Sequence, residues 1–351
     1  MKSKAKSLLK IIITIVLVVG SVYYSLHNVD LGKLWHSILK ANYWWAVAAV
    51  PVILLSHWLR ALRWRTLLKP VKEPESMQNL FSAVMIGYAV NNITPRGGEL
   101  IRPLTYSKRE KVPLGTVMAT VLVERFIDVL SLLVFIAVAF LVVHEKIKIV
   151  FPDITFKSVF FAVILPTIIL LAILVLSVAT NAGEAMLRRL VRPFSENLYN
   201  KLHRLLESFI HGLAILKSPS AYAQIIFETL GIWILYILPM YIMFFAFDFQ
   251  SRLHLGIADA TFILLIQSIG VTLAPTPGAI GIYHTLVKIT MMNFYGLSEE
   301  ESLAYATVTH AVGYILTMVV GGYYAMHENI KGFEPRGATG ETTIPDKVTA
   351  R

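Results

Sequence analysis

Cysteine is absent from the 351 residues, and charged side chains are scarce. Without a thiol the chain forms no disulfide, no thiolate nucleophile and no cysteine-ligated metal centre. Only 15% of the residues are Asp, Glu, Lys or Arg and 56% are hydrophobic, against about 25% and about 45–50% in soluble domains. The sequence also lacks a G-x-x-x-x-G-K-S/T phosphate loop and an H-E-x-x-H zinc motif, so no ATP-driven pump, cofactor or metal site is predicted.

Hydrophobic residues are collected into eight blocks of 17 to 27 residues. A helix of that length crosses the hydrocarbon core of a bilayer, which is about 30 Å thick. We therefore predict an all-α, polytopic membrane helix bundle over residues 1–330, followed by a disordered cytoplasmic tail at 331–351. The eight blocks are 8–24, 43–59, 77–93, 117–143, 158–180, 221–247, 257–273 and 302–325.

Basic residues predict the orientation of this bundle. Of the 32 lysines and arginines, 24 lie in the segments 1–10, 60–75, 96–111 and 181–220 and in the tail after residue 326. Cytoplasmic loops are enriched in basic residues, so we predict an inner-membrane protein with both termini in the cytoplasm and a retained N-terminal signal anchor. The formal charge of +10 then reflects topology and anionic lipid, and no nucleic-acid partner is predicted.

Eight simple crossings conflict with this charge pattern, because 96–111 and 181–220 would then face outside. The conflict disappears if 77–110 enters from the cytoplasm, breaks near Pro95 and returns, while 257–296 does the same from outside. We predict six full spans and two re-entrant helical hairpins; the alternative is eight ordinary spans with a weak charge bias. Irregular backbone at membrane depth is tolerated beside protein or a water-filled cavity, so both breaks should line a cavity.

The two breaks resemble each other in sequence. The first reads Asn91-Asn92-Ile93-Thr94-Pro95-Arg96-Gly97-Gly98, and the second reads Val271-Thr272-Leu273-Ala274-Pro275-Thr276-Pro277-Gly278. Three predicted spans separate them, so the two copies would face opposite ways. Paired Pro/Gly interruptions in inverted halves indicate the central site of a transporter, although two similar turns also arise by chance.

Polar side chains surround the first break. Pro95 removes a backbone donor and the glycines expose backbone, so polar groups are freed at low dielectric. A helix that begins near Gly98 would offer unpaired N–H groups to an anion, and Arg96 and Arg102 could clamp a phosphate. The alternative is that these side chains form the cytoplasmic rim. The predicted substrate-binding residues here are Asn91, Asn92, Pro95, Arg96, Gly98, Glu99 and Arg102.

Three ionisable residues, Glu124, Arg125 and Asp128, interrupt an apolar block. Each charge costs about 2.5–3.5 kcal/mol at the centre of a membrane, so all three should face the bundle interior and find partners there. Glu124 and Asp128 lie one turn apart on one helix face. A structural ion-pair cluster and a substrate or proton pathway both fit this pattern. The candidate partners elsewhere in the chain are His284, His310 and Tyr314.

The basic segment 181–220 is amphipathic, with leucines recurring every three or four residues opposite charged side chains. We predict that it lies on the inner leaflet or caps the bundle, broken at Pro193.

At these positions the chain resembles the transmembrane, flippase-like family of the lysylphosphatidylglycerol synthases, which includes the flippase half of the multiple peptide resistance factor. The likeness extends from about residue 8 to 327. No soluble aminoacyl-transfer domain follows the last predicted span, so lysyl transfer is not carried over. The motifs are Asn92-x-x-Pro95-x-x-Gly98-Glu99-x-x-Arg102, Glu124-Arg125-x-x-Asp128 and Pro275-x-Pro277-Gly278-x-x-Gly281.

The resemblance implies a flippase or transporter that moves a phospholipid, or an aminoacylated or glycosylated lipid, between membrane leaflets. Such a protein would bind anionic, aminoacylated or polyprenyl-linked lipids, with Pro275, Pro277, Gly278, Gly281, His284 and His310 added to the site. Two alternatives stay open: a membrane lipid-modifying transferase, and a non-catalytic subunit that anchors another protein through 181–220. A homo-oligomer is compatible with each of the three.

Overall fold

The computed structural model describes residues 2–69, 76–150, 161, 165, 168–169, 182–200, 202–204, 219–273 and 276–327, and every regular element in these ranges is a helix. The predicted all-α membrane fold is therefore confirmed. The helices are α1 (Lys2–Leu26), α2 (Leu31–Lys40), α3 (Tyr43–Leu68), α4 (Met77–Ile93), α5 (Gly98–Glu110), α6 (Leu114–Val150), α9 (Ala182–Leu190), α11 (Pro219–Ala246), α12 (Phe249–Leu253), α13 (Ile257–Leu273), the 3-10 turn η3 (Pro277–Ala279), α14 (Ile282–Tyr295) and α15 (Glu299–His327).

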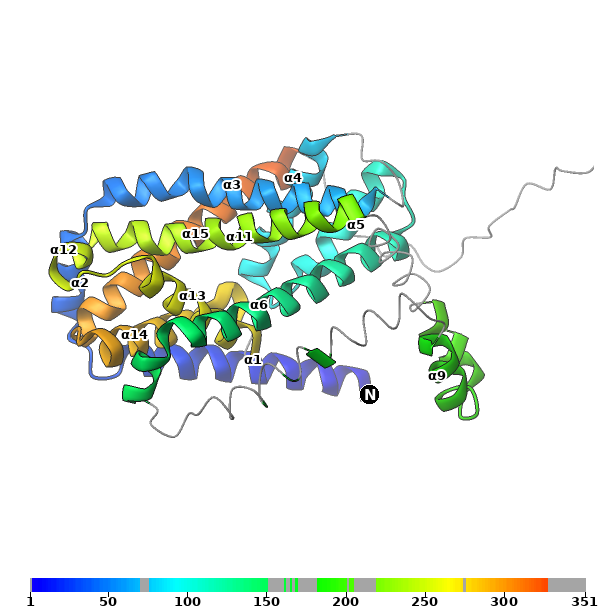
Figure 1. Cartoon of the computed structure of the whole chain (residues 1–351), viewed down its shortest axis with the longest axis horizontal. Helices are drawn as coiled ribbons and strands as arrows, with labels where there is room; N and C mark the ends of the chain where they lie inside the picture. Colours follow the sequence, from blue (N-terminus) through cyan, green and yellow to red (C-terminus); the bar gives the residue numbers. More distant parts are fainter. Residues whose placement is uncertain are drawn as a thin grey trace, which may run out of the picture.

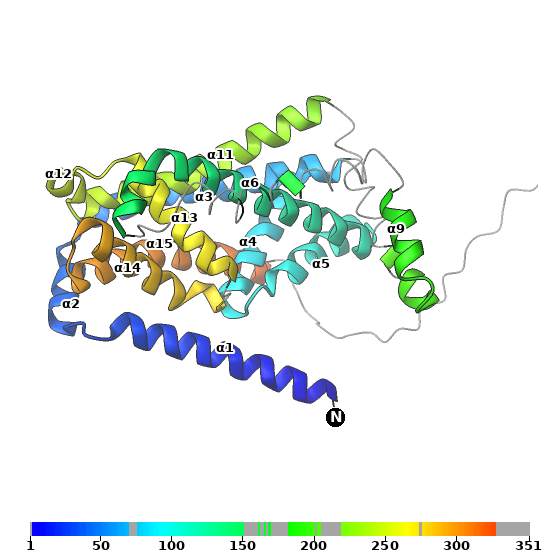
Figure 2. The same ribbon diagram turned by 60° about the horizontal axis from the view of Figure 1, so that its bottom comes forward.

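The long helices lie roughly parallel to the longest axis of the molecule (Figure 1). α3 and α11 run antiparallel, side by side, and α15 packs behind them. α1 lies along one edge of the bundle, where it contacts α14 (Figure 2). The ends of the molecule differ: α2 and α12 lie at one end, while the start of α1, the end of α3 and α9 lie at the other.

Three of the described helices are long and apolar enough to cross a membrane: α3, residues 221–246 of α11, and α15. A fourth results if Thr14–Leu26 and the helix α2, which bends away from it by 85°, count as one span. The predicted block 158–180 and the predicted tail 331–351 lie almost wholly outside the described residues. The count of six spans therefore stays a prediction.

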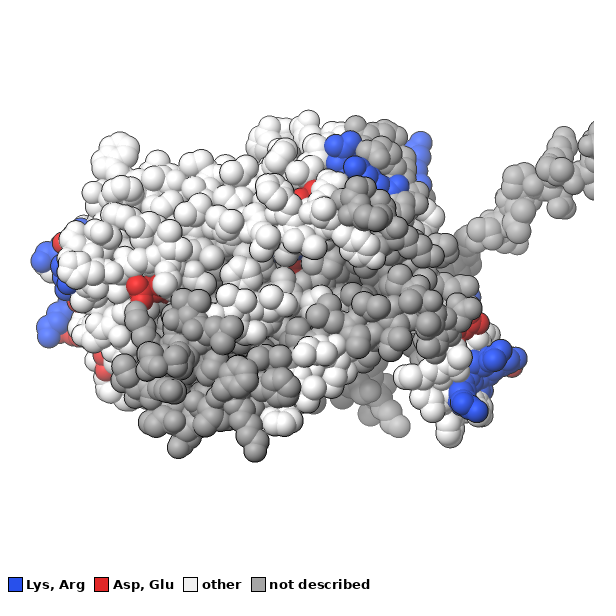
Figure 3. Space-filling model, in the orientation of Figure 1, with Lys and Arg blue, Asp and Glu red and all other residues white. Residues whose placement is uncertain are grey.

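Charge is distributed along the same axis. Figure 3 shows the lysine and arginine side chains of the visible face at the two ends of the molecule, with few charges between them. α2 exposes Leu31, Trp35 and Leu39 on one side, and Tyr43 and Trp44 follow it. Exposed aromatic residues beside an apolar belt are typical of a membrane–water interface.

The structure corrects the prediction that 60–75 is a loop. α3 continues to Leu68, because the sequence has no proline or glycine between Pro51, which lies within the helix, and Pro70. Arg60 and Arg63 therefore lie within the helix and are only 5% and 1% exposed. These two arginines belong to the interior of the bundle, although the orientation argument counted them as loop charges.

α4 and α5 form the first predicted hairpin. α4 ends at Ile93, and the chain turns through Pro95 and Arg96, whose φ of 56° is left-handed. α5 packs closely against α4: a Cβ on Gly98 would overlap the carbonyl oxygen of Gly87. Only glycine permits this approach of two backbones.

α13 and α14 form the second hairpin. They are joined through η3, in which Gly278 and Ala279 have φ of 56° and 59°, and Gly281 follows at 82°. A Cβ on Gly281 would overlap the hydroxyl of Ser21 on α1, so the turn also sets the position of α1. Pro275 lies outside the described residues.

The two hairpins approach each other from opposite ends of the bundle, and their turns meet beside the middle of α15 (Figures 1 and 2). Asn92 Nδ2 donates to the carbonyl of Tyr314 at 3.2 Å and to Thr317 Oγ1 at 2.9 Å. The Nε2 of His310 lies 2.7 Å from the carbonyl oxygen of Gly278. This arrangement is the one that an inverted repeat requires; the repeat itself stays a prediction.

α9 lies beyond the end of the bundle (Figure 1). It ends at Leu190, before Pro193, and helical residues resume at Glu196. Most of 201–218 lies outside the described residues, so the membrane contact predicted for 181–220 stays a prediction.

Candidate functional site

Glu124 and Asp128 of α6 face α3, whose Arg60 and Arg63 lie one turn apart on one side. Arg60 Nε is 3.0 Å from Glu124 Oε1, and its NH2 is 2.5 Å from Asp128 Oδ2. Arg63 NH2 pairs with Asp128 Oδ1 and lies 3.5 Å from Glu124 Oε1. Both oxygens of Asp128 are thus occupied, and Glu124 is completely buried. Burial of these charges is tolerated because each one is paired.

Arg102 of α5 completes the buried part of this cluster. Its NH1 lies 2.8 Å from Glu124 Oε2, and its guanidinium stacks 3.9 Å from the ring centroid of Trp64. The Trp64 indole in turn donates to Thr120 Oγ1 at 3.0 Å. Arg102 is 5% exposed, so it links α3, α5 and α6 from within rather than facing an open space.

A cavity of about 620 Å³ lies next to the cluster, at the meeting point of the two hairpins. Its wall combines polar and apolar side chains. Its polar lining consists of Arg60, Arg63, Tyr88, Asn91, Asn92, Arg96, Glu99, Arg125, Asp128, Tyr236, Ser268, Thr272 and Thr276. Its apolar lining consists of Leu122, Val129, Leu132, Ile232, Trp233, Val271, Gly278 and Ala279.

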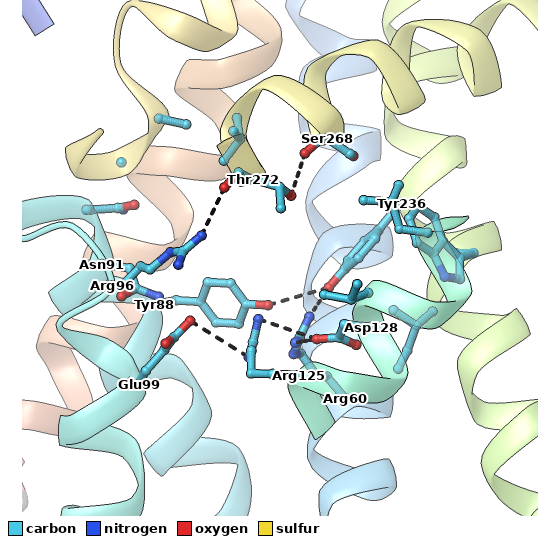
Figure 4. Close-up of a pocket in the computed structure, with 18 of the residues that line it drawn as sticks. Arg60, Tyr88, Asn91, Arg96, Glu99, Arg125, Asp128, Tyr236, Ser268 and Thr272 are labelled. Atoms are coloured by element: carbon cyan, nitrogen blue, oxygen red, sulfur yellow. Dashed lines mark hydrogen bonds and ion pairs between the residues drawn. The ribbon is translucent and has the colours of Figure 1, made fainter. Parts of the chain in front are cut away.

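Two tyrosines extend the ion network into the cavity (Figure 4). Arg60 NH1 donates to the hydroxyl of Tyr236 at 2.8 Å, and this hydroxyl lies 3.4 Å from that of Tyr88. Arg63 NH1 donates to Thr229 Oγ1 at 3.2 Å. Arg60 and Arg63 are therefore held in place by partners on two other helices.

Arg125 and Arg96 are the less tightly held cations of the cavity. Arg125 is 3.4 Å from Asp128, 3.8 Å from Glu124 and 3.9 Å from Glu99, and its side chain is 40% exposed. Arg96 NH2 donates to the carbonyl oxygen of Thr272 at 3.0 Å, across the gap between the hairpins (Figure 4).

The predicted anion site at the start of α5 is wrong in one respect. α5 does begin at Gly98, but its N–H groups are not free. Gly98 N donates to Asn91 Oδ1 at 2.8 Å, and the next three N–H groups donate to the carbonyls of Arg96 and Gly97. The start of α5 therefore offers no free backbone N–H group among Gly98 to Ile101, and only side chains at this turn retain donors for an anion.

The predicted site residues that the structure describes fall into four groups. Asn91, Asn92, Arg96, Glu99, Arg125, Asp128 and Gly278 line the cavity. Gly98, Arg102 and Glu124 are buried beside it, while Pro95 and Pro277 form the turns. The rings of His284 and His310 meet edge to face with their centroids 4.8 Å apart, and the ring of His310 also contacts that of Tyr314. The described partners of Glu124 and Asp128 are arginines and not these side chains. Whether any of these residues binds a substrate stays a prediction.

The sequence did contain a signal for the missed arginines. Arg60 and Arg63 are spaced i, i+3, which places them on one helix face if the apolar block 43–59 continues as a helix. Glu124 and Asp128, in the distant apolar block 117–143, need cationic partners because an unpaired charge within a membrane is costly. Tyr88 and Tyr236 give no comparable signal, because tyrosine is common in membrane helices.

The profile of the lysylphosphatidylglycerol synthase TM region family matches residues 10–321. The chain belongs to this family. A UPF0104 membrane protein of Methanocaldococcus jannaschii is 24% identical, over 92% of this chain and 94% of that protein. Another, from Methanothermobacter thermautotrophicus, is 26% identical, over 83% of this chain and 87% of that protein.

The glycosyltransferase AglD of Haloferax volcanii is also similar, with 24% identity over 80% of this chain. The match covers 48% of that protein, so the chain spans about half the length of AglD. No solved structure matches the chain. The resemblance deduced from the Pro-x-x-Gly-Glu and Glu-Arg-x-x-Asp motifs is confirmed, and the chain is an integral membrane protein of this family.

Proposed function

We propose that this protein moves a phospholipid, or an aminoacylated or glycosylated lipid, between the leaflets of its membrane. A polar headgroup crosses hydrocarbon only if polar groups replace the water that it loses. The observation that carries the proposal is the cavity of about 620 Å³ where the two hairpins meet, with both arginines and apolar side chains in its wall. A lipid likewise combines a polar headgroup, which arginines can bind, with apolar acyl chains, which apolar side chains can contact.

The helices around the cavity suit alternating access. The turns of the hairpins are tied to α15 through Asn92 and His310, and to each other through Arg96 and Thr272. These are few hydrogen bonds between rigid helical arms, so one hairpin can move against the other without loss of the helices. Rocking of one half against the other would open the cavity to each side in turn.

The test is leaflet exchange by the purified chain in liposomes that contain a fluorescent phospholipid, followed by quenching of the outer leaflet with dithionite. The protein should let the inner-leaflet fluorescence become accessible. Arg125→Gln should slow exchange about tenfold or more, since hydrogen bonds to charged groups contribute about 1.5–3 kcal/mol. The matched control is Arg252→Gln, whose pair with Glu301 lies in α12 and α15 at the end of the molecule. No exchange above empty liposomes, or equal loss in both variants, would overturn the proposal.

The similarity to AglD favours a second candidate, a transferase that modifies a membrane lipid. The same liposomes distinguish the two candidates. A lipid product of new mass after addition of an activated sugar donor would support transfer, whereas exchange with unchanged lipid mass supports transport.

A further inference from the structure

The charged side chains that line the cavity are unbalanced. Four arginines line it, Arg60, Arg63, Arg96 and Arg125, against the two carboxylates of Glu99 and Asp128. The formal charge of the lining is therefore +2. The buried ions behind the wall leave this balance unchanged, because the carboxylate of Glu124 is matched by the guanidinium of Arg102. The field in the cavity therefore favours an anion.

Two carboxylates at the site, those of Asp128 and Glu124, are already occupied. Asp128 receives Arg60 on one oxygen and Arg63 on the other. Glu124 is fully buried, does not line the cavity, and is shared by Arg60, Arg63 and Arg102. To bind either of them, an ammonium group would have to displace a guanidinium that is fixed by other partners. Only Glu99, whose contact with Arg125 is 3.9 Å long, remains for a cation.

Two guanidiniums, in contrast, retain donors for a ligand. Among the residues that the structure describes, Arg125 makes contacts of 3.4–3.9 Å with carboxylates and no shorter hydrogen bond. Arg96 gives one N–H to the neutral carbonyl of Thr272. A phosphate accepts two parallel bonds from a guanidinium and binds it more strongly than a neutral carbonyl does.

Resting on the proposed function, we propose that the cavity selects lipids by charge: it takes a lipid whose headgroup is net anionic, with Arg125 and Arg96 as the phosphate ligands, and rejects the aminoacylated, net cationic counterpart. The hydroxyls of Tyr88 and Tyr236 are placed for the uncharged part of the headgroup, and the apolar wall around Trp233 accommodates the start of the acyl chains. Glu99 contacts Arg125 at 3.9 Å, and its negative charge repels a bound anion.

The experiment compares three acyl-labelled lipids in identical liposomes: phosphatidylglycerol, zwitterionic phosphatidylethanolamine, and lysylphosphatidylglycerol. Phosphatidylglycerol should exchange at least about tenfold faster than lysylphosphatidylglycerol, because like charges brought together at low dielectric cost several kcal/mol. Arg125→Gln should reduce this ratio, Glu99→Gln should increase it, and Arg252→Gln should leave it unchanged.

The outcomes separate the inference from the proposed function. Equal exchange of all three lipids, or faster exchange of the lysyl lipid, would overturn charge selection while transport stands. If no lipid exchanges, transport fails, and charge selection is decided by thermal melting of the full chain in mixed micelles. Phosphatidylglycerol should then raise the melting temperature and lysylphosphatidylglycerol should not; equal shifts, or no shift with either, would overturn the inference.

Discussion

At the scale of single residues, the site is a cluster of buried charges, and each charge is stabilised only by its oppositely charged partners in the cluster. Arg60, Arg63 and Arg102 share Glu124, and the first two also share Asp128. Replacement of a whole buried ion cluster by apolar residues is often neutral, but removal of one member strands the others in a low dielectric. The cluster therefore fixes the positions of α3, α5 and α6 rather than adding stability in proportion to its size.

Glu124→Gln should lower the free energy of unfolding by about 3–5 kcal/mol, because three guanidiniums lose their shared charge. Adding Arg102→Met to this variant should recover part of the loss, since it removes one of the stranded cations. Chemical unfolding in detergent, with Arg252→Gln as the exposed-pair control expected to change by less than about 1 kcal/mol, measures both effects. Additive losses in the double variant would contradict the account.

The sequence predicted half of this cluster. Glu124, Arg125 and Asp128 stand out because charges within an apolar block are costly. Arg60 and Arg63 directly follow an apolar block, where a basic residue is ordinary, so their i, i+3 spacing was a weak signal, and the packing of α3 against α6 showed their place. Arg102 was predicted to bind a phosphate because it lies close to the turn at Pro95. In the structure it lies one turn into α5, is buried, and pairs with Glu124.

At the scale of elements, the two hairpins were the most predictable feature, since Pro95, Gly98, Pro277 and Gly278 mark breaks in apolar runs. The contact between the two turns could not be predicted, because it depends on how α15 packs against both. The close pairing of α4 with α5 depends on Gly98, whose Cβ position lies 2.6 Å from the carbonyl carbon of Gly87.

Gly98→Ala should therefore force α5 away from α4 and destabilise the protein by about 1–3 kcal/mol, the usual effect of overpacking. Gly115→Ala is the matched control: nothing lies within 4 Å of its Cβ position in α6, so alanine should be neutral or stabilise the helix by about 0.5–1 kcal/mol. Melting temperatures of the two variants in the same detergent test this, and equal melting temperatures would show that the hairpin is not closely packed at Gly98.

At the scale of the whole molecule, the charged side chains of the visible face lie mostly at the two ends, few lie in the belt between them, and the cavity lies within the bundle (Figure 3). Composition and block length were sufficient to predict the belt. A cavity beside the two breaks was also predicted, but the rest of its wall required the structure. That wall combines α3, α4, α5, α6, α11, α13 and η3, which are distant in sequence. If this arrangement is correct, water reaches the cavity while lipid covers the belt.

Labelling of single cysteines in the cysteine-free chain, reconstituted in liposomes, tests this most directly. Ser268→Cys and Thr272→Cys lie in the cavity wall, and Ile315→Cys lies on the exposed apolar side of α15. With charged, membrane-impermeant thiosulfonates, the account predicts that positions 268 and 272 react, and faster with the anionic reagent than with the cationic one, while position 315 stays unlabelled. Unreactive cysteines at 268 and 272, or a preference for the cationic reagent, would contradict it.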